Sequence, residues 1–286
     1  MDIDLARTFL EVISTGSFIA AARNLHVTQT TVTARIQTLE AELGCRLFVR
    51  NRSGARLTRD GERFSGHASQ LVQTWAAARR ELPLPQGSVR LAVLGCELSL
   101  WNPLMVEWLL RLRAEQADLA VRAEVNEAGA LHEKLKFGLI DTALVHRPDY
   151  WPGMQVEQLI EEKLVMVRAA ASAEPYVYVD WGEAFRRLHD AALPEHARAS
   201  LTVDLGPLAL QLLLSSGGSG YFRTRVVQPY LDSGQLHRVP QTPEFSYPAY
   251  LVYPRDIDND TLPSVLSAIR NAAQATPGKW ASPPAS

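Results

Sequence analysis

A proline-rich hinge, Pro83-Leu84-Pro85-Gln86-Gly87, separates two parts of the chain that differ in hydrophobic periodicity. Before the hinge, apolar residues recur at spacings of three and four, which is typical of amphipathic helices. After it, short apolar runs of strand length alternate with helical patterns, which is typical of a sheet covered by helices. The sequence therefore predicts an α+β protein of more than one domain, with a helical N-terminal part and an α/β body.

The first sixty residues predict short helices followed by an extended arm. Thr15-Gly16-Ser17 interrupts the first helical pattern, and Ser17 can cap a second helix. Thr28 can cap a third helix and Gly44 can end it. The apolar positions of this third helix, spaced by 4, 3 and 4, are Val32, Ile36, Leu39 and Leu43. They form one narrow buried stripe, so the opposite face stays free.

The free face of the third helix carries side chains that can read DNA. Glutamine can make two hydrogen bonds to adenine, and threonine offers both a hydroxyl and a methyl group. Backbone amides at a helix N-terminus can hold a phosphate, and the arginines of the arm can bind phosphates or the minor groove. The candidate residues are Thr28 at the start of the helix, Gln29, Thr30, Thr33, Ala34 and Gln37 on it, and Arg50, Arg52, Arg56 and Arg59 near the arm. This is the outline of a winged helix-turn-helix; the alternative is a helical protein-interaction module.

The charge is distributed unevenly along the chain. Residues 1–80 carry eleven Lys or Arg against seven Asp or Glu, whereas residues 81–286 carry eighteen against twenty-four. A basic N-terminal part on an acidic body favours a nucleic-acid-binding head.

Residues 58–82 predict a longer helix with a heptad seam. Thr58 can cap this helix and Pro83 stops it. A seam of this kind packs against a partner helix, so we expect it to pair two chains; the alternative is packing within one chain. The seam positions are Phe64, Ala68, Leu71, Trp75, Ala78 and Leu82.

Beyond the hinge, strands and helices alternate. This alternation predicts a parallel sheet with helices on its faces, arranged as two α/β halves of about a hundred residues with a cleft between them. The expected strands are 89–94, 119–125 and 140–146 in the first half and 176–179, 200–204 and 249–253 in the second. A last helix is expected near 262–273 and a loose tail from Pro277.

Residues 17–61 resemble the helix-turn-helix of LysR-type transcription regulators. The matching runs are SFIAAARNLHVTQTTVTARIQTLE at 17–40, LGCRLFVR at 43–50 and LTRDG at 57–61. The resemblance implies that Gln29, Thr30, Thr33 and Arg35 contact DNA and that Arg50, Arg52 and Arg56 belong to the wing. The family more often has serine in place of Thr28, Thr30 and Thr33, so the operator preference can differ.

The resemblance also implies domain boundaries and assembly. It predicts a winged helix-turn-helix at 1–60, a linker helix and hinge at 61–86, and a two-lobed effector domain like the periplasmic binding proteins at 87–286. The linker helix pairs two chains in the family, and many members are tetramers, so a homodimer or homotetramer on a partly palindromic duplex operator is expected. Thr74 to Arg80 and Leu98 to Trp101 resemble a subgroup of flagellar-operon regulators.

The body resembles the LysR effector domain, whose small-molecule ligand lies between the lobes. The candidate effector-binding residues are Cys96, Glu97, Ser99, His146, Arg147, Asp204, Tyr221 and Arg223. Glu97 is a departure, because many members have a hydroxyl residue near there to hold a carboxylate. An acid would repel an anion, whereas Arg147 and Arg223 would attract one, so the charge of the ligand stays open, as does a sensor without a ligand.

Other classes of protein find little support in the sequence. Cys45 and Cys96 sit in no metal-ligand spacing, and neither a phosphate loop nor a nucleophile elbow is present, so we expect no cofactor, no metal and no enzyme. A periplasmic solute receptor would need a signal peptide and no DNA-binding head. No apolar run is long enough for a membrane span, and a cytoplasmic protein is expected.

Overall fold

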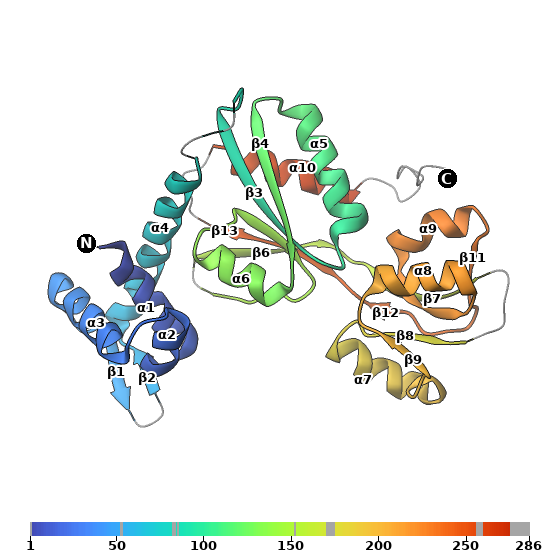
Figure 1. Cartoon of the computed structure of the whole chain (residues 1–286), viewed down its shortest axis with the longest axis horizontal. Helices are drawn as coiled ribbons and strands as arrows, with labels where there is room; N and C mark the ends of the chain where they lie inside the picture. Colours follow the sequence, from blue (N-terminus) through green and yellow to red (C-terminus); the bar gives the residue numbers. More distant parts are fainter. Residues whose placement is uncertain are drawn as a thin grey trace.

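The computed structural model describes residues 2–51, 54–81, 84, 86–151, 153–169, 175–255 and 260–274. Arg52, Leu82 and the tail from Pro277 lie outside this part of the chain. The head, a first lobe and a second lobe follow one another along the long axis of the molecule (Figure 1).

The head is a helical bundle with a two-stranded arm. The second and third helices begin where hydroxyl residues cap them: Ser17 Oγ accepts from Ala20 N at 3.4 Å, and Thr28 Oγ1 accepts from Thr31 N at 3.1 Å. Phe9 lies at the centre, with its ring centroid 5.2 Å from that of Phe48. The elements are α1 (Ile3–Thr15), α2 (Phe18–Asn24), α3 (Gln29–Leu43), β1 (Phe48–Asn51), β2 (Gly54–Leu57) and the long α4 (Arg59–Glu81). β1 and β2 pair antiparallel and form the wing.

Lobe 1 is built on a sheet of strand order β4-β3-β5-β13-β6. Strands β4, β3, β5 and β6 run in one direction, and β13, which lies between β5 and β6, is antiparallel to both. The prediction of a parallel sheet is therefore wrong in this lobe at β13, which is antiparallel to both of its neighbours. The strands are β3 (Arg90–Glu97), β4 (Leu119–Asn126), β5 (Thr142–Val145), β6 (Met154–Ile160) and β13 (Ala249–Pro254). The helices are a short π-helical turn η1 (Trp101–Met105), α5 (Val106–Glu115), α6 (Ala128–Lys136) and α10 (Leu262–Gln274).

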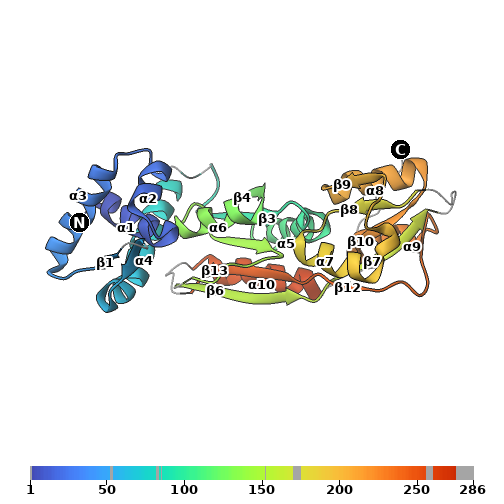
Figure 2. The same ribbon diagram turned by 90° about the horizontal axis from the view of Figure 1, so that it is seen from below.

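Lobe 2 has an antiparallel sheet of order β10-β7-β11, to which β12 adds through β7, and a parallel pair β8-β9. These strands are β7 (Lys163–Ala169), β8 (Val177–Val179), β9 (Leu201–Val203), β10 (Ser219–Arg223), β11 (Leu236–Arg238) and β12 (Phe245–Ser246). The helices are α7 (Glu183–Ala192), the 3₁₀ turn η2 (Pro194–His196), α8 (Gly206–Ser216) and α9 (Thr224–Asp232). Figure 2 shows the second lobe at the end of the molecule remote from the head.

The chain passes between the lobes twice, after β6 and again after β12. The strand at 249–253, expected in the second half, therefore belongs to lobe 1, where Leu251 faces Leu144 of β5. α10 also returns to lobe 1, and Trp108 Nε1 donates to Val265 O at 2.9 Å. A lobe of this kind closes its core with residues from both ends of the body, which local periodicity does not reveal.

Candidate nucleic-acid interface and ligand cleft

The third helix presents a free face, as its apolar stripe requires. Val32 and Ile36 are buried in the head, whereas Gln29, Thr30 and Gln37 are exposed. Thr33 is half-buried, and Thr28 is the N-cap rather than a residue of the helical face. Helix α3 lies at the outer edge of the head, away from both lobes (Figure 1), and its exposed face carries hydrogen-bond donors and acceptors suited to base edges.

Arg35 is partly engaged within the head. Its Nη1 donates to Thr8 Oγ1 at 3.3 Å, and its Nη2 lies 3.5 Å from Asp4 Oδ2, both on α1. These contacts orient the side chain along the first helix. The role of Arg35 in DNA binding stays a prediction. A phosphate or base would have to compete with Asp4 for the Arg35 guanidinium.

The wing is held in place by a buried carboxylate that the sequence interpretation missed. Glu40 Oε1 accepts from Leu47 N at 2.8 Å and from Phe48 N at 3.3 Å, and Glu40 Oε2 pairs with Arg46 at 2.9 Å. Glu40 thus fixes the start of β1 against the end of α3. Arg56 is exposed on β2, and Arg50 lies on β1. The signal was Glu40 itself, a charged residue adjoining the buried stripe.

The predicted seam on α4 divides into two stripes. Phe64, expected in the seam, instead packs against Phe9 with ring centroids 5.1 Å apart, and Ala68 is fully buried in the same chain. Leu71 and Trp75 are 41% and 48% exposed, and with Ile3 they line an open groove. This outward stripe is the part of α4 that is free to meet a partner helix.

The two lobes enclose a cavity of about 700 Å³. The carboxyl ends of β3, β5, β8 and β9 open onto it, which is where open α/β sheets bind ligands. The lining includes the predicted residues Glu97, Ser99, His146, Arg147 and Asp204. It also includes residues that the sequence interpretation missed, among them Glu127, Asp180, Trp181, Gly182 and Tyr247. Asp180 to Gly182 follow a predicted strand, so their place at the carboxyl end was the signal available.

Three predicted effector residues do not line this cavity. Cys96 is buried in the core of lobe 1 and Tyr221 in that of lobe 2. Both are strand residues whose side chains point into the sheet layers. Arg223 is fully buried at the hinge, where its Nη2 lies 2.6 Å from Glu162 Oε2 and its Nη1 donates to the backbone carbonyl of Ser99. The charge of Arg223 is therefore paired with Glu162 between the lobes.

The electrostatics of the cavity centre on Glu97 and His146. Glu97 Oε2 accepts from His146 N at 2.7 Å. Burial raises the pKa of the Glu97 carboxyl, against the opposing effects of that hydrogen bond and of Arg147 and Arg223. Burial, with Arg223 and Arg147 nearby, holds the pKa of His146 well below its usual value, so the imidazole is neutral at pH 7. The Tyr247 ring lies 3.8 Å from the imidazole, centroid to centroid.

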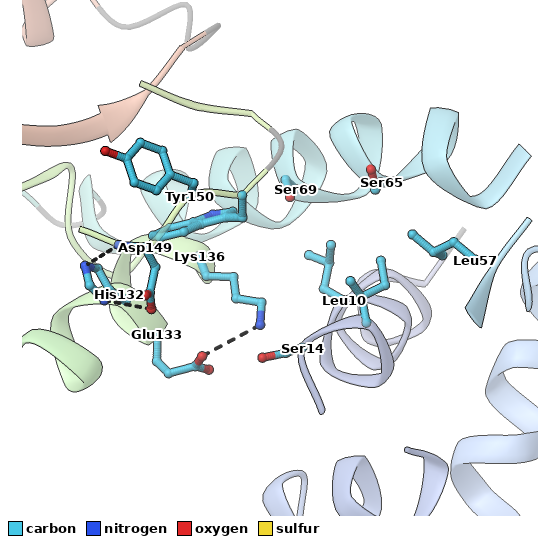
Figure 3. A pocket seen from close by; sticks show the side chains of 12 residues that line it. Leu10, Ser14, Leu57, Ser65, Ser69, His132, Glu133, Lys136, Asp149 and Tyr150 are labelled. Atoms are coloured by element: carbon cyan, nitrogen blue, oxygen red, sulfur yellow. Dashed lines mark hydrogen bonds and ion pairs between the residues drawn. The ribbon is translucent and has the colours of Figure 1, made fainter. Parts of the chain in front are cut away.

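A second cavity, of about 330 Å³, lies at the junction between the head, α4 and lobe 1 (Figure 3). His132 and Lys136 of α6 face it from one side and Leu10 and Ser14 of α1 from the other. His132 Nδ1 lies 3.0 Å from Asp149 Oδ2. The junction is tight nearby, because a Cβ added to Gly138 would lie 2.6 Å from Gln73 Cα of α4.

A winged helix-turn-helix joined to a two-lobed body with a cleft defines a class of ligand-responsive transcription regulators, and the sequence comparisons identify the family. The model of the bacterial regulatory helix-turn-helix protein, lysR family, matches residues 3–62. That of the LysR substrate binding domain matches residues 84–274. The chain belongs to the LysR family of bacterial transcription regulators.

Relatives and solved structures agree with this family over nearly the whole chain. The HTH-type transcriptional regulator HdfR of Yersinia pestis is 29% identical, covering 96% of this chain and 99% of its own. Full-length LysG of Corynebacterium glutamicum, solved with bound effector Arg, has a TM-score of 0.59 at 16% identity, covering 96% and 98%. ArgP of Mycobacterium tuberculosis has a TM-score of 0.54 at 22% identity, with the same coverages.

Proposed function

We propose that this regulator reads its operator through the exposed face of α3, presented twice by a homodimer. The observation that supports this most directly is the division of α3 into a buried stripe and a free face whose residues are Gln29, Thr30, Thr33 and Gln37. The N-terminus of α3 brings backbone amides toward a phosphate. Arg56 on the wing adds a cation that positions the protein without specifying sequence.

We further propose that the outward stripe of α4 forms the dimer contact and that a small molecule in the inter-lobe cavity modulates DNA binding. The dimer contact is supported by the exposure of Leu71 and Trp75, because a partner helix would bury these two side chains. The effector role is supported by the inter-lobe cavity and by the arginine effector bound to LysG, a protein of the same fold.

We infer, because its relatives are transcription regulators, that the protein acts in the bacterial cytoplasm by binding rather than by catalysis. Separately, no group of His, Cys, Asp or Glu among the described residues is arranged to hold a metal ion. No single helix of this part of the chain is long and apolar enough to span a membrane, although α1 and α2 together, bent by 119°, reach that length and composition.

Selection of DNA from a random duplex pool with the purified protein tests the proposed reading face. Gln29→Ala and Gln37→Ala should each weaken binding to the selected site by about tenfold, because each loses hydrogen bonds to a base worth about 1–3 kcal/mol. Gln211→Ala, an exposed glutamine on α8, is the matched control and should bind normally. Equal binding by all three variants would contradict the assignment of α3.

The salt dependence of binding tests the wing. The logarithm of affinity should fall steeply with the logarithm of salt concentration, because arginine–phosphate contacts release counterions. Arg56→Ala should reduce that slope by about one. A slope unchanged by this substitution would place Arg56 away from the phosphates.

A further inference from the structure

We propose that the inter-lobe cavity is selective for an organic cation, a molecule bearing an ammonium or guanidinium group, bound by the carboxylates of Glu97 and Asp204 and the rings of Trp181 and Tyr247. This inference rests on the proposed effector role of the cavity and names the chemical class of the ligand. All four residues line the same cavity, and they come from both lobes and from the segment that joins them.

The cavity wall is strongly acidic. It carries four carboxylates, Glu97, Glu127, Asp180 and Asp204, against the guanidinium of Arg147. Asp180 is neutralised by an ion pair with Arg186 of α7. In the described part of the chain, Glu97, Glu127 and Asp204 have no cation within ion-pair distance. A low-dielectric cleft with this charge concentrates cations and repels anions.

Helix dipoles stabilise two of these carboxylates, but not that of Glu97. Glu127 is the N-cap residue of α6, and Asp204 lies two residues before α8, so both are stabilised by a helix N-terminus. Glu97 is the last residue of β3 and is half-buried. Burying a carboxylate without a counter-ion costs free energy, even though the His146 N–H donates to it, and the raised pKa of Glu97 reflects that cost. A bound cation would remove it.

His146 adds a hydrogen-bond acceptor to the wall. Its Nδ1 lies 2.8 Å from Pro248 O, and a carbonyl can only accept, so Nδ1 carries the proton of the neutral ring. Nε2 is then an acceptor, and it is buried with no donor among the described residues. The side chain is 7% exposed. An acceptor without a donor, beside a carboxylate, suits a ligand that is rich in N–H groups.

Two aromatic rings complete the arrangement. Trp181 and Tyr247 line the cavity with ring centroids 5.5 Å apart, inclined at 69°. The Trp181 indole N–H donates to Tyr221 O at 2.9 Å, which fixes the ring. Aromatic faces attract ammonium and guanidinium groups, the more so when desolvated. Arg147, whose guanidinium lies against Gly182, can pair with a carboxylate if the ligand also has one.

Calorimetry with the full-length protein tests the ligand class. The probes are agmatine, a guanidinium amine without a carboxylate, L-arginine, and the dianion succinate. Agmatine and L-arginine should bind, and succinate should bind at least tenfold more weakly than either. Glu97→Gln should weaken agmatine binding at least tenfold, whereas Glu115→Gln, an exposed carboxylate on α5, should not. Thermal unfolding of both variants checks that they fold.

A pH series separates the charge of Glu97 from its shape. Agmatine binding should tighten as the pH rises from about 5 to about 8, because the carboxyl must ionise to hold a cation. In Glu97→Gln this dependence should be reduced. Succinate binding that equals or exceeds agmatine binding, or an absence of agmatine and L-arginine binding at millimolar concentration, would overturn the proposal.

The outcomes also separate this inference from the proposed function. If selected DNA binds and only succinate or no probe binds, the cation preference fails while the DNA-binding regulator stands. If agmatine binds but no DNA is selected, the reading face fails and the cleft chemistry stands.

Discussion

Arg223 and Glu162 form a fully buried ion pair at the hinge between the lobes, with Arg223 Nη2 2.6 Å from Glu162 Oε2. Arg223 ends β10 in lobe 2, and Glu162 lies in the segment that crosses from β6 to β7. The guanidinium also donates to the Ser99 carbonyl in lobe 1. One side chain thus ties the crossing segment to both lobes, and Ser99, to which it donates, lines the cavity.

Removing one member of this pair should destabilise the body strongly. Arg223→Met would remove the ion-pair partner of the buried Glu162 carboxylate, which would keep only the hydrogen bond from Arg225 N, and we expect a loss of about 3–5 kcal/mol in the free energy of unfolding. The double variant Arg223→Met/Glu162→Leu should recover part of that loss, because no unpaired charge remains. Urea unfolding measures both. A double variant no more stable than Arg223→Met would show that the pair acts through something other than charge.

A charge on the outward stripe of α4 should separate the dimer. Trp75 is 48% exposed and lies in an apolar groove with Leu71 and Ile3. Trp75→Asp would place a carboxylate where a partner helix should pack, so we expect the mass measured by light scattering to fall to that of a smaller assembly. Leu188→Asp on α7, where Leu188 is 49% exposed, is the matched control. An unchanged mass for Trp75→Asp would exclude this stripe as the contact.

His146 should make the protein less stable in mild acid. Its pKa is lower in the folded state than in the unfolded chain, mainly because burial disfavours the charged ring. Below about pH 6.5 the unfolded chain therefore binds a proton that the folded chain does not, and the free energy of unfolding falls, by at most about 1.4 kcal/mol per pH unit. Above that pH the contribution of His146 is complete and constant.

Unfolding of wild type and His146→Gln across the same pH range isolates this effect. The stability of the wild type should fall relative to His146→Gln as the pH drops, because glutamine does not titrate. His237→Gln, at an exposed histidine, should follow the wild type. Parallel profiles for wild type and His146→Gln would refute a depressed pKa.

Gly138 should be intolerant of a side chain because of the junction. Its φ is +63°, and an added Cβ would lie 2.6 Å from Gln73 Cα, a backbone atom that cannot move alone. Gly234 has a similar φ of +74° with nothing within 4 Å of its Cβ position. Both alanine variants carry the left-handed backbone cost of about 1–2 kcal/mol. Gly138→Ala should lose about a further 1–3 kcal/mol through overpacking.

Urea unfolding and limited proteolysis compare the two glycine variants. Gly138→Ala should also be cleaved faster by protease between the head and lobe 1, because α4 and lobe 1 can no longer pack closely. Equal losses in the free energy of unfolding for the two variants would mean that the junction accommodates the added methyl group without overpacking.

Local patterns predicted much of the head. Ser17, Thr28 and Gly44 bound the helices as expected, because a cap is a short-range interaction between neighbouring residues. The predicted stripe is buried at Val32, Ile36 and Leu39, but the prediction is wrong for Leu43, which is 40% exposed at the last residue of α3. The family followed from motif order, and the domain comparisons support it.

Features that depend on residues far apart in the chain were not predicted from the sequence. The seam at Phe64 and Ala68 has the same spacing as that at Leu71 and Trp75, yet the first pair packs in its own chain and the second is exposed. Spacing identifies which residues share a helix face but not what covers it. For the same reason the expected cleft residues separated into five that line the cavity and three that are buried elsewhere.

By itself the sequence determined the helices and caps of the head, the free face of α3, the family and the two-lobed body, since each depends on residues close together in the chain. Only the tertiary structure decided that β13 and α10 return to lobe 1 and that Arg223 forms an ion pair with Glu162. It also decided that Glu97 shares a cavity with Trp181 and Tyr247. Those relationships join residues far apart in the chain, and the packing that brings them together leaves no local periodicity.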